Sequence, residues 1–322
     1  MTKKLLAGID LGGTKILSGL FDEDGTLLDS IKMATRAETG MAETIKRMTG
    51  SITSLMESCS EGLELTGLVV GIPGPVDTAT GYIYDTPNLG WKDIELARLL
   101  QQSLGVPVWL ENDGNLAALG EYLYGYKESF PTMLYLTAST GVGGGIIING
   151  RIHRGADGTA GEFGHMTIIP EGLICHCGNR GCLETLASGS AVARKAKERV
   201  LKGYGVRMME LAHNNLERID ARLVGEAADQ GDEEAELILN EAFTYLGIGA
   251  ANLVNMFNPH AIVIGGGLAS LTGRCFAAVK REIEQRTFHR SWENLQVLPV
   301  KLNGMAGLMG CFALWEQELK KI

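Results

Sequence analysis

One histidine and three cysteines occur at a spacing that could bind a metal ion. His165 is followed by Cys175, Cys177 and Cys182, and glycines between the last two allow a tight turn. One imidazole and three thiolates complete the tetrahedral shell that Zn²⁺ prefers. His176 is an alternative ligand, but side chains of adjacent residues diverge, so His165 is favoured. No open coordination position is evident, and we expect a structural zinc site rather than three unrelated reduced cysteines.

Three glycine-rich segments have the composition of loops that bind phosphate or a nucleoside. Residues 10–15 read Asp-Leu-Gly-Gly-Thr-Lys after an apolar run, so N–H groups could meet phosphate oxygens while Asp10 holds Mg²⁺. A hairpin turn with glycines at positive φ explains that hexapeptide equally well. Residues 139–145 form a second such loop, and two facing loops could clamp a triphosphate. A third cluster, residues 265–267, follows an apolar strand and precedes a helix, where a base or ribose could approach.

A dinucleotide-binding site for hydride transfer is the alternative use of these glycines. That fingerprint requires the glycine loop to open a helix directly after the first strand. Here the first loop leads into an apolar strand at residues 15–21, and the second leads into another at residues 145–148. The context therefore excludes hydride chemistry.

Carboxylates in three places could bind and activate a hydroxyl group. The sequence Glu111-Asn112-Asp113 ends a predicted strand, where Asp113 could accept a hydroxyl proton and Asn112 could fix a second hydroxyl. Taken alone, this segment favours Asp113 as the N-cap of the following helix. Glu162 and Glu184 flank the cysteine cluster, and each by itself resembles a solvated surface acid. Gathered near one site, these groups would make a pocket for a polyhydroxyl compound.

The elements that must position these residues follow an α/β pattern that occurs twice. A strand–loop–strand–turn–strand series spans residues 5–31 and again residues 133–153, which predicts two related lobes that share a cleft. We assign residues 1–112 to a smaller first lobe, completed by a C-terminal helix at residues 305–322, and residues 113–304 to a larger one. Further helices are predicted at residues 42–56, 95–104, 115–122 and 233–256, and further strands at residues 68–72, 106–110 and 261–264.

Composition restricts the classes of protein to consider. The chain has 322 residues, about twice the ~150 typical of one domain, and 45% of them are hydrophobic and 21% charged, as in an ordinary globular protein. Its net charge is −9 without a basic block, so we expect no nucleic-acid partner. No signal peptide or membrane-spanning segment is evident, and clustered rather than paired cysteines suit a reducing compartment. We therefore expect a cytoplasmic protein with no membrane partner.

The motifs together resemble the ROK family (repressors, open reading frames, kinases) and, within it, the bacterial glucokinases. The resemblance spans residue 8 to about residue 267 in the family's order, and the cysteine cluster joined to Gly-Glu-Phe-Gly-His is its most specific part. The matching segments are residues 10–15, 71–77 (Gly-Ile-Pro-Gly-Pro-Val-Asp), 87–91 (Pro-Asn-Leu-Gly-Trp), 111–113, 139–145, 161–165 and 175–184. One residue departs from the family, which usually has alanine where this chain has Gly114.

This resemblance implies a fold and a set of residue roles. The fold would be the duplicated actin-like, ribonuclease-H-like α/β fold of two-lobe sugar kinases, with an interlobe cleft. Asp113 would be the catalytic base. The implied sugar-binding residues are Gly74, Asn88, Asn112, Asp113, Glu162, His165 and Glu184. The implied nucleotide-binding residues are Asp10, Gly12, Gly13, Thr14, Lys15, Thr140, Gly141, Gly265, Gly266 and Gly267, with Mg²⁺ at Asp10.

The implied activity is transfer of a phosphoryl group from ATP to the 6-hydroxyl of glucose. Such a reaction needs positioning, charge neutralisation by Mg²⁺ and one carboxylate that orients the hydroxyl. A kinase for N-acetylmannosamine, N-acetylglucosamine, allose or fructose is a close alternative. A sugar-binding regulator is a more distant one, because the family's repressors carry an N-terminal DNA-binding domain and the first phosphate loop here begins at residue 10. The family resemblance also implies a homodimer or homotetramer.

Overall fold

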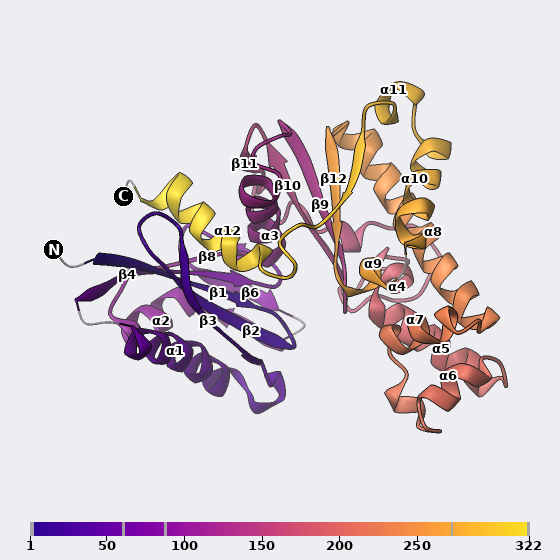
Figure 1. Ribbon diagram of the computed structural model, residues 1–322, viewed down its shortest axis with the longest axis horizontal. Coiled ribbons are helices and arrows are strands. Elements are labelled where there is room, and N and C mark those ends of the chain that lie inside the picture. The colour runs from indigo at the N-terminus through magenta and orange to yellow at the C-terminus, as the bar shows by residue number, and fades with distance from the viewer. Residues whose placement is uncertain (1–2, 60–61, 87–88, 272, 321–322) are drawn as a thin grey trace. The chain divides into compact units, whose positions relative to one another are not determined.

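The computed structural model describes residues 3–59, 62–86, 89–271 and 273–320, and the chain forms two compact units (Figure 1). Unit 1 comprises Met1–Pro131, Gly145–Gly161 and Lys301–Ile322, and unit 2 comprises Thr132–Gly144 and Glu162–Val300. This division differs from the expected boundary after residue 112, because residues 113–131 and 145–161 lie in unit 1. Four crossings of the chain between the units, rather than two, account for the difference.

Unit 1 contains a five-stranded sheet made of β3 (Leu27–Ala34), β2 (Lys15–Phe21), β1 (Lys3–Leu11), β4 (Leu63–Ile72) and β8 (Val108–Asn112), in that order. β1, β2 and β3 are antiparallel neighbours, whereas β4 and β8 run parallel to β1. Helices α1 (Met41–Ser58) and α2 (Leu96–Leu104) cover one face of this sheet, and α12 (Ala306–Leu314) covers the other (Figure 1). The apolar run of β1 is therefore buried on both faces of the sheet, since successive side chains point to opposite faces.

Helix α3 (Asp113–Gly120) belongs to unit 1 because its backbone packs directly against α12. A Cβ atom at Gly310 would lie 1.9 Å from the carbonyl oxygen of Leu116, and one at Gly120 would lie 2.2 Å from that of Ala306. Only glycine permits this approach, which fixes the height of α3 on the sheet. The predicted helix at residues 115–122 begins two residues earlier than expected, and π-helical backbone continues it over Glu121–Gly125.

A small antiparallel sheet in unit 1 was not predicted from the sequence. It consists of β5 (Val76–Asp77), β6 (Tyr82–Thr86) and β7 (Trp91–Ile94). The three strands are short and turn residues separate them, so the sequence shows no clear alternation of apolar and polar residues. The sheet nevertheless buries Val76, Ile83 and Trp91 against the core of unit 1.

The second five-stranded sheet consists of β11 (Arg151–Ile152), β10 (Val142–Ile148), β9 (Thr132–Ala138), β12 (Ala261–Gly265) and β13 (Gln296–Pro299), in that order. The first three strands along the chain, β9, β10 and β11, lie next to one another in that order. β12 then pairs parallel with β9, and β13 pairs parallel with β12, which is the strand order of the sheet in unit 1. The predicted duplication is therefore confirmed. One expectation was wrong in detail: β10 begins at Val142, so part of the predicted glycine-rich loop is strand.

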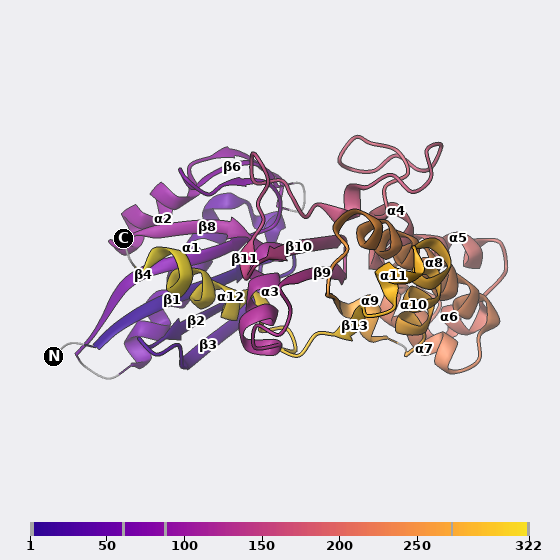
Figure 2. The same ribbon diagram turned by 90° about the horizontal axis from the view of Figure 1, so that it is seen from above.

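Of this second sheet, β9, β12, β13 and residues 142–144 of β10 belong to unit 2, which is otherwise helical. Helices α8 (Glu233–Phe257) and α10 (Arg274–Arg286) pack side by side in unit 2 (Figure 2). By length and composition, α8 among the described helices could cross a membrane, but 61% of its most apolar window is buried inside the structure, as in a core helix. The remaining helices are α4 (Glu184–Ala187), α5 (Gly189–Leu201), α6 (Val206–Leu211), α7 (Ala221–Asp229), α9 (Gly267–Ser270) and α11 (His289–Trp292), and there are 3-10 turns at Ala37–Thr39, Phe163–His165 and Leu216–Arg218.

Candidate functional sites

The carboxyl ends of three neighbouring parallel strands in unit 1 bring several predicted site residues together. Asp10 near the end of β1 lies opposite Gly71 of β4, and Gly71 lies opposite Glu111 of β8. Asp113 directly follows β8, and a Cβ atom on Gly71 would lie 3.6 Å from its Cα atom. The carboxyl edge of a parallel sheet is where α/β folds commonly bind ligands. This edge therefore carries both the predicted base and the predicted Mg²⁺ ligand.

The start of α3 shows that Asn112, not Asp113, is the helix cap. The side chain of Asn112 accepts a hydrogen bond of 3.1 Å from the backbone N–H of Asn115, and Asp113 is the first helical residue. The interpretation of Asp113 as the N-cap is therefore wrong, because the neighbouring amide already performs that role. One carboxylate oxygen of Asp113 accepts from the N–H of Gly114 at 2.9 Å. The cap thus gives no reason for a carboxylate at position 113.

The amide nitrogen of Asn112 connects α3 to the loop after β4. It donates to the carbonyl oxygen of Gly74 at 3.3 Å. Gly74 has a φ of 97°, and a Cβ atom there would lie 2.9 Å from the carbonyl oxygen of Asp85. Both features require glycine, so the loop that the sequence assigned to the sugar is fixed beside Asn112. The predicted sugar ligand Asn88 lies outside the described residues.

The loop between β1 and β2 has the geometry of a tight hairpin. The N–H of Gly12 donates to the carbonyl oxygen of Lys15 at 2.8 Å, and the hydroxyl of Thr35 donates to that of Gly12 at 2.6 Å. Neither Gly12 nor Gly13 is among the glycines with positive φ, so backbone conformation alone does not require them. Small size at these positions suits a close ligand, as predicted for phosphate.

Asp10 sits in a buried position beside a cation. Its side chain is 16% exposed, and Lys15 Nζ lies 3.7 Å from one carboxylate oxygen. Burial raises the pKa of Asp10, and the charge and hydrogen bond of Lys15 oppose that shift. A Cβ atom at Gly307, in the first turn of α12, would lie 2.8 Å from the Asp10 carboxyl carbon. A carboxylate in this setting can hold a divalent cation through its remaining oxygen positions.

The second predicted phosphate loop, between β9 and β10, is held by the start of α5. The N–H of Gly189 donates to the carbonyl oxygen of Ser139 at 2.7 Å, and that of Ser190 donates to Thr140 at 3.2 Å. A Cβ atom at Gly141 would lie 2.3 Å from a carboxylate oxygen of Glu184. Glycine at position 141 therefore lets Glu184 reach the loop, and Thr140 remains exposed at its tip.

The three consecutive glycines after β12 have different structural reasons. A Cβ atom at Gly265 would lie 2.6 Å from Val300, and one at Gly266, whose φ is 92°, would lie 2.1 Å from the carbonyl oxygen of Ala138. These two glycines permit close packing within unit 2. A Cβ atom at Gly267 would meet nothing within 4 Å. Gly267 therefore leaves open space at the start of α9, where the nucleoside was expected to approach.

Two acids and two histidines gather in unit 2. His176 Nδ1 lies 3.1 Å from one carboxylate oxygen of Glu184, and the N–H of Val142 donates to the other at 2.9 Å. The side chain of Glu184 is 15% exposed, so its interpretation as a solvated surface acid is wrong. Glu162 lies 4.0 Å from His165 Nε2. Burial raises the pKa of Glu162, an effect that His165 opposes and Glu184 reinforces.

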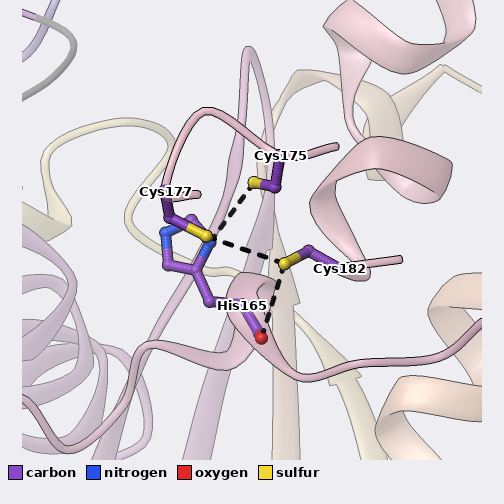
Figure 3. A group of neighbouring side chains, drawn as sticks. All are labelled: His165, Cys175, Cys177 and Cys182. Carbon is purple, nitrogen blue, oxygen red and sulfur yellow. Dashed lines mark hydrogen bonds between the residues drawn. The ribbon is translucent and has the colours of Figure 1, made fainter. Parts of the chain in front are cut away.

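The predicted zinc ligands converge on one point, as Figure 3 shows. Ligand atoms of His165, Cys175, Cys177 and Cys182 all lie within 4.8 Å of one another. The Sγ atoms of Cys177 and Cys182 are 3.7 Å apart, and Cys175 Sγ lies 3.7 Å from His165 Nδ1. Ligands at Zn–S of about 2.3 Å and Zn–N of about 2.0 Å in a tetrahedron stand about 3.5–3.8 Å apart. The donor set and its spacing therefore fit Zn²⁺.

The backbone around the cysteines forms the expected tight turn. The N–H of Cys175 donates to the carbonyl oxygen of Asn179 at 2.7 Å, and that of Gly178 donates to Cys175 at 2.9 Å. Gly178 and Gly181 have φ values of 91° and 67°, which only glycine adopts readily. His176 also reaches towards the cluster, since its Nδ1 atom lies 3.9 Å from Cys175 Sγ, but the shorter contact with Glu184 gives it another partner.

The structure thus groups the predicted residues by unit. Unit 1 holds Asp10, Gly12–Lys15, Gly74, Asn112 and Asp113, and unit 2 holds Thr140, Gly141, Glu162, His165, Glu184, the cysteines and Gly265–Gly267. Arg154, beside Glu111, carried no assigned role in the sequence, and His176, named there only as an alternative zinc ligand, lies beside Glu184. A lone histidine or arginine has no motif, and only the fold reveals its partner.

Comparisons with known proteins point to one family. A family model described as the ROK family matches residues 6–318. A glucokinase of Halalkalibacterium halodurans is 35% identical over 320 residues, which are 99% of this chain and 97% of that protein. The xylose repressor of Bacillus subtilis is 32% identical over 307 residues, which are 94% of this chain and 74% of that protein. A ROK family glucokinase from Streptomyces griseus, in complex with glucose and AMPPNP, has a TM-score of 0.83 at 34% identity, with 97% of this chain and 99% of that chain covered.

Proposed function

The chain belongs to the ROK family, and we propose that it is a glucokinase that transfers the γ-phosphoryl group of ATP to the 6-hydroxyl of glucose. It has the actin-like fold of the family's sugar kinases, as its sequence motifs predicted. The observation that carries the proposal is Asp113, an acid at a strand end whose neighbour Asn112 already caps the helix. The helix cap therefore does not explain the carboxylate at position 113, and its place at the carboxyl edge of the parallel sheet suits a base for a bound hydroxyl.

In this reaction Asp113 accepts the proton of the 6-hydroxyl as that oxygen attacks phosphorus. A positioned carboxylate typically contributes about 10²–10⁴-fold as a general base. The position of Asp113 at the start of α3 is fixed by its neighbour, because the side chain of Asn112 binds both the N–H of Asn115 and the carbonyl oxygen of Gly74. We propose that Asn112, Gly74 and Asn88 contact other hydroxyls of the sugar.

We propose that Glu162, His165 and Glu184 hold the remaining sugar hydroxyls. His165 presents Nδ1 to the cysteine cluster, which leaves Nε2 on the side of Glu162, 4.0 Å away. One ring nitrogen can then bind Zn²⁺ while the other donates towards the sugar, so the metal would orient this histidine. The zinc role is structural, with His165, Cys175, Cys177 and Cys182 as ligands.

The glycine-rich loops supply the proposed nucleotide site. Gly12, Gly13, Thr14 and Lys15 would face the phosphates together with Thr140 and Gly141, with the backbone N–H groups of Gly13 and Thr14 as donors. Asp10 would hold Mg²⁺, which neutralises phosphate charge during transfer. The open space at Gly267, beside Gly265 and Gly266, would receive the nucleoside.

Two other functions remain as alternatives. Another hexose, such as N-acetylmannosamine, N-acetylglucosamine, allose or fructose, would require a different fit around the ring positions at which it differs from glucose. A sugar-binding regulator is the second alternative, because a xylose repressor covers 94% of this chain at 32% identity. We propose glucose and ATP as partners, a homodimer or homotetramer in the cytoplasm, and neither nucleic acid nor membrane as a ligand.

A panel of hexoses tests these functions directly. The purified chain is incubated with Mg²⁺·ATP and each sugar named above, and ADP release is followed by a coupled assay. We expect the highest kcat/KM with glucose, and 6-phosphorylated product by mass spectrometry. A higher kcat/KM for another hexose would reassign the substrate. Calorimetric glucose binding without any turnover would reassign the chain as a regulator.

A further inference from the structure

Glu111 is a buried acid whose two carboxylate oxygens are both engaged. Its side chain is 2% exposed. Oε1 accepts from the backbone N–H of Asn112 and from the side-chain amide of Asn115, each at 3.0 Å. Oε2 accepts from Arg154 Nε at 2.6 Å. Residues 112 and 115 stand on either side of Asp113 along the chain, so one buried carboxylate holds the backbone before the proposed base and the Asn115 side chain after it.

Arg154 is in turn held by the C-terminal segment of unit 1. Its Nη1 and Nη2 atoms donate to the two carboxylate oxygens of Glu318 at 3.3 and 2.9 Å. Glu318 lies in the π-helical turn Trp315–Leu319 that follows α12. The guanidinium is 24% exposed, less than the 30% of Glu318, so exposure increases outwards along the chain of contacts from Glu111. A planar guanidinium with five donors suits such a double role.

We propose that Arg154 is a positioning residue for Asp113, acting through Glu111, and that Glu318 fixes Arg154 in the required orientation. The catalytic part of this inference rests on the proposed kinase function. Glu111, Arg154 and Glu318 form what we call the anchor chain, and all three lie in unit 1. They touch neither the proposed sugar ligands in unit 2 nor the phosphate loops in any contact described above.

A buried carboxylate such as that of Glu111 keeps its position only while its charge is compensated. Without Arg154, Glu111 would be a buried acid with two weak amide donors and no cation, which is costly. It would then bind a proton or turn towards water, and Oε1 would release the Asn115 amide and the Asn112 N–H. Asp113 lies between these residues, and a displacement of ~1 Å at a reacting group can cost about 10²-fold in rate.

The experiment compares Arg154→Met with Arg151→Met, a matched control three residues earlier on β11. Arg151 is exposed and lies outside the anchor chain. We expect Arg154→Met to lower kcat for glucose phosphorylation by about tenfold or more, with KM for ATP changed less than about twofold, and Arg151→Met to match the wild type. Arg154→Lys should recover part of kcat, because a cation again faces Glu111. Unchanged kcat per folded molecule in Arg154→Met would overturn the proposal.

A second measurement keeps the proposal testable if the first variant folds poorly or the wild type has no kinase activity. Glu318→Gln retains the Arg154–Glu111 pair but weakens the contact that holds Arg154 in place. It should therefore also lower kcat, with KM for ATP unchanged. Hydrogen–deuterium exchange at the amides of residues 112–116 reports the anchoring without any turnover. Faster exchange there in Glu318→Gln, with no change in Arg151→Met, supports the anchor chain. Equal exchange would refute it, whereas an inactive wild type would refute only the proposed function.

Discussion

Replacement of Asp113 by asparagine separates a catalytic base from a structural acid. The side chains are nearly isosteric, so asparagine can still accept from the N–H of Gly114, a contact of 2.9 Å in the wild type. The helix cap is untouched, because Asn112 provides it through its bond to Asn115 N–H. The variant therefore tests the loss of a group that can take the hydroxyl proton.

The effects of Asp113→Asn on stability and on kcat can be estimated separately. A negative charge in the first turn of a helix stabilises it by about 0.3–1 kcal/mol, so loss of that charge in Asp113→Asn should cost about this much in stability. Loss of a general base should lower kcat by about 10²–10⁴-fold, or ~3–5 kcal/mol of transition-state stabilisation. The activity effect should thus exceed the stability effect several-fold.

Asn112→Ala provides the matched control at the next residue. It removes the cap and the amide bond to Gly74, so it should lower the free energy of unfolding by about 0.5–2 kcal/mol. Stability is measured by urea unfolding, kcat by a dehydrogenase-coupled assay of glucose 6-phosphate, and glucose Kd by calorimetry. For Asp113→Asn we expect near-normal stability and Kd with a collapse of kcat.

Retention of more than about a tenth of wild-type kcat in Asp113→Asn would refute the assignment, because so small a loss of rate lies below the usual effect of removing a general base. The base would then have to be sought among the other carboxylates, of which Glu162 and Glu184 are the next to test. A large loss of stability with kcat per folded molecule preserved would instead indicate that Asp113 supports α3.

Three further predictions follow from the geometry. Metal analysis should find about one Zn²⁺ per chain, and Cys177→Ala should lose it together with thermal stability; a metal-free preparation with normal melting and activity would contradict this site. Gly12→Ala has room for its methyl group and should raise KM for ATP about tenfold while KM for glucose stays within about twofold; equal effects on both would contradict the phosphate assignment. Gly310→Ala should destabilise the protein by more than about 3 kcal/mol, because its Cβ atom would lie 1.9 Å from the carbonyl oxygen of Leu116. The control, Gly50→Ala in α1, places its Cβ atom where no other atom lies within 4 Å and should stabilise the protein by up to about 1 kcal/mol. Similar urea midpoints for the two variants would refute the close packing of α3 against α12.

The sequence predicted the elements that carry strong periodicity or strong turn chemistry. The hairpin loop at residues 12–14, the long helix α8 and the cysteine turn all lie where expected, and the loop predicted at residues 139–145 is found over its first three residues. The helix start at α3 was misplaced, because asparagine and aspartate are almost equally good caps and stand side by side. Composition cannot choose between them, and only the hydrogen bond to Asn115 identifies the cap as Asn112.

Long-range contacts were beyond the reach of spacing arguments. Arg154 is 43 residues from Glu111 and 164 from Glu318, and none of the three belongs to a motif that names its partner. The division into units was missed for the same reason, since glycines at positions 120 and 310 bring α3 and α12 together only in the folded chain. Close packing of small residues leaves no periodic signal.

Glu184 joins two sites that the sequence treated as separate. One of its carboxylate oxygens accepts from Val142 N–H, next to the phosphate loop, and the other faces His176, which lies between two proposed zinc ligands. Any movement of the cysteine turn therefore reaches the loop at Gly141 through a single buried acid. Removal of zinc should on this argument weaken the binding of ATP as well as of glucose. A purely local role of the metal would change the glucose Kd alone, so calorimetry with each substrate on metal-free protein distinguishes the two.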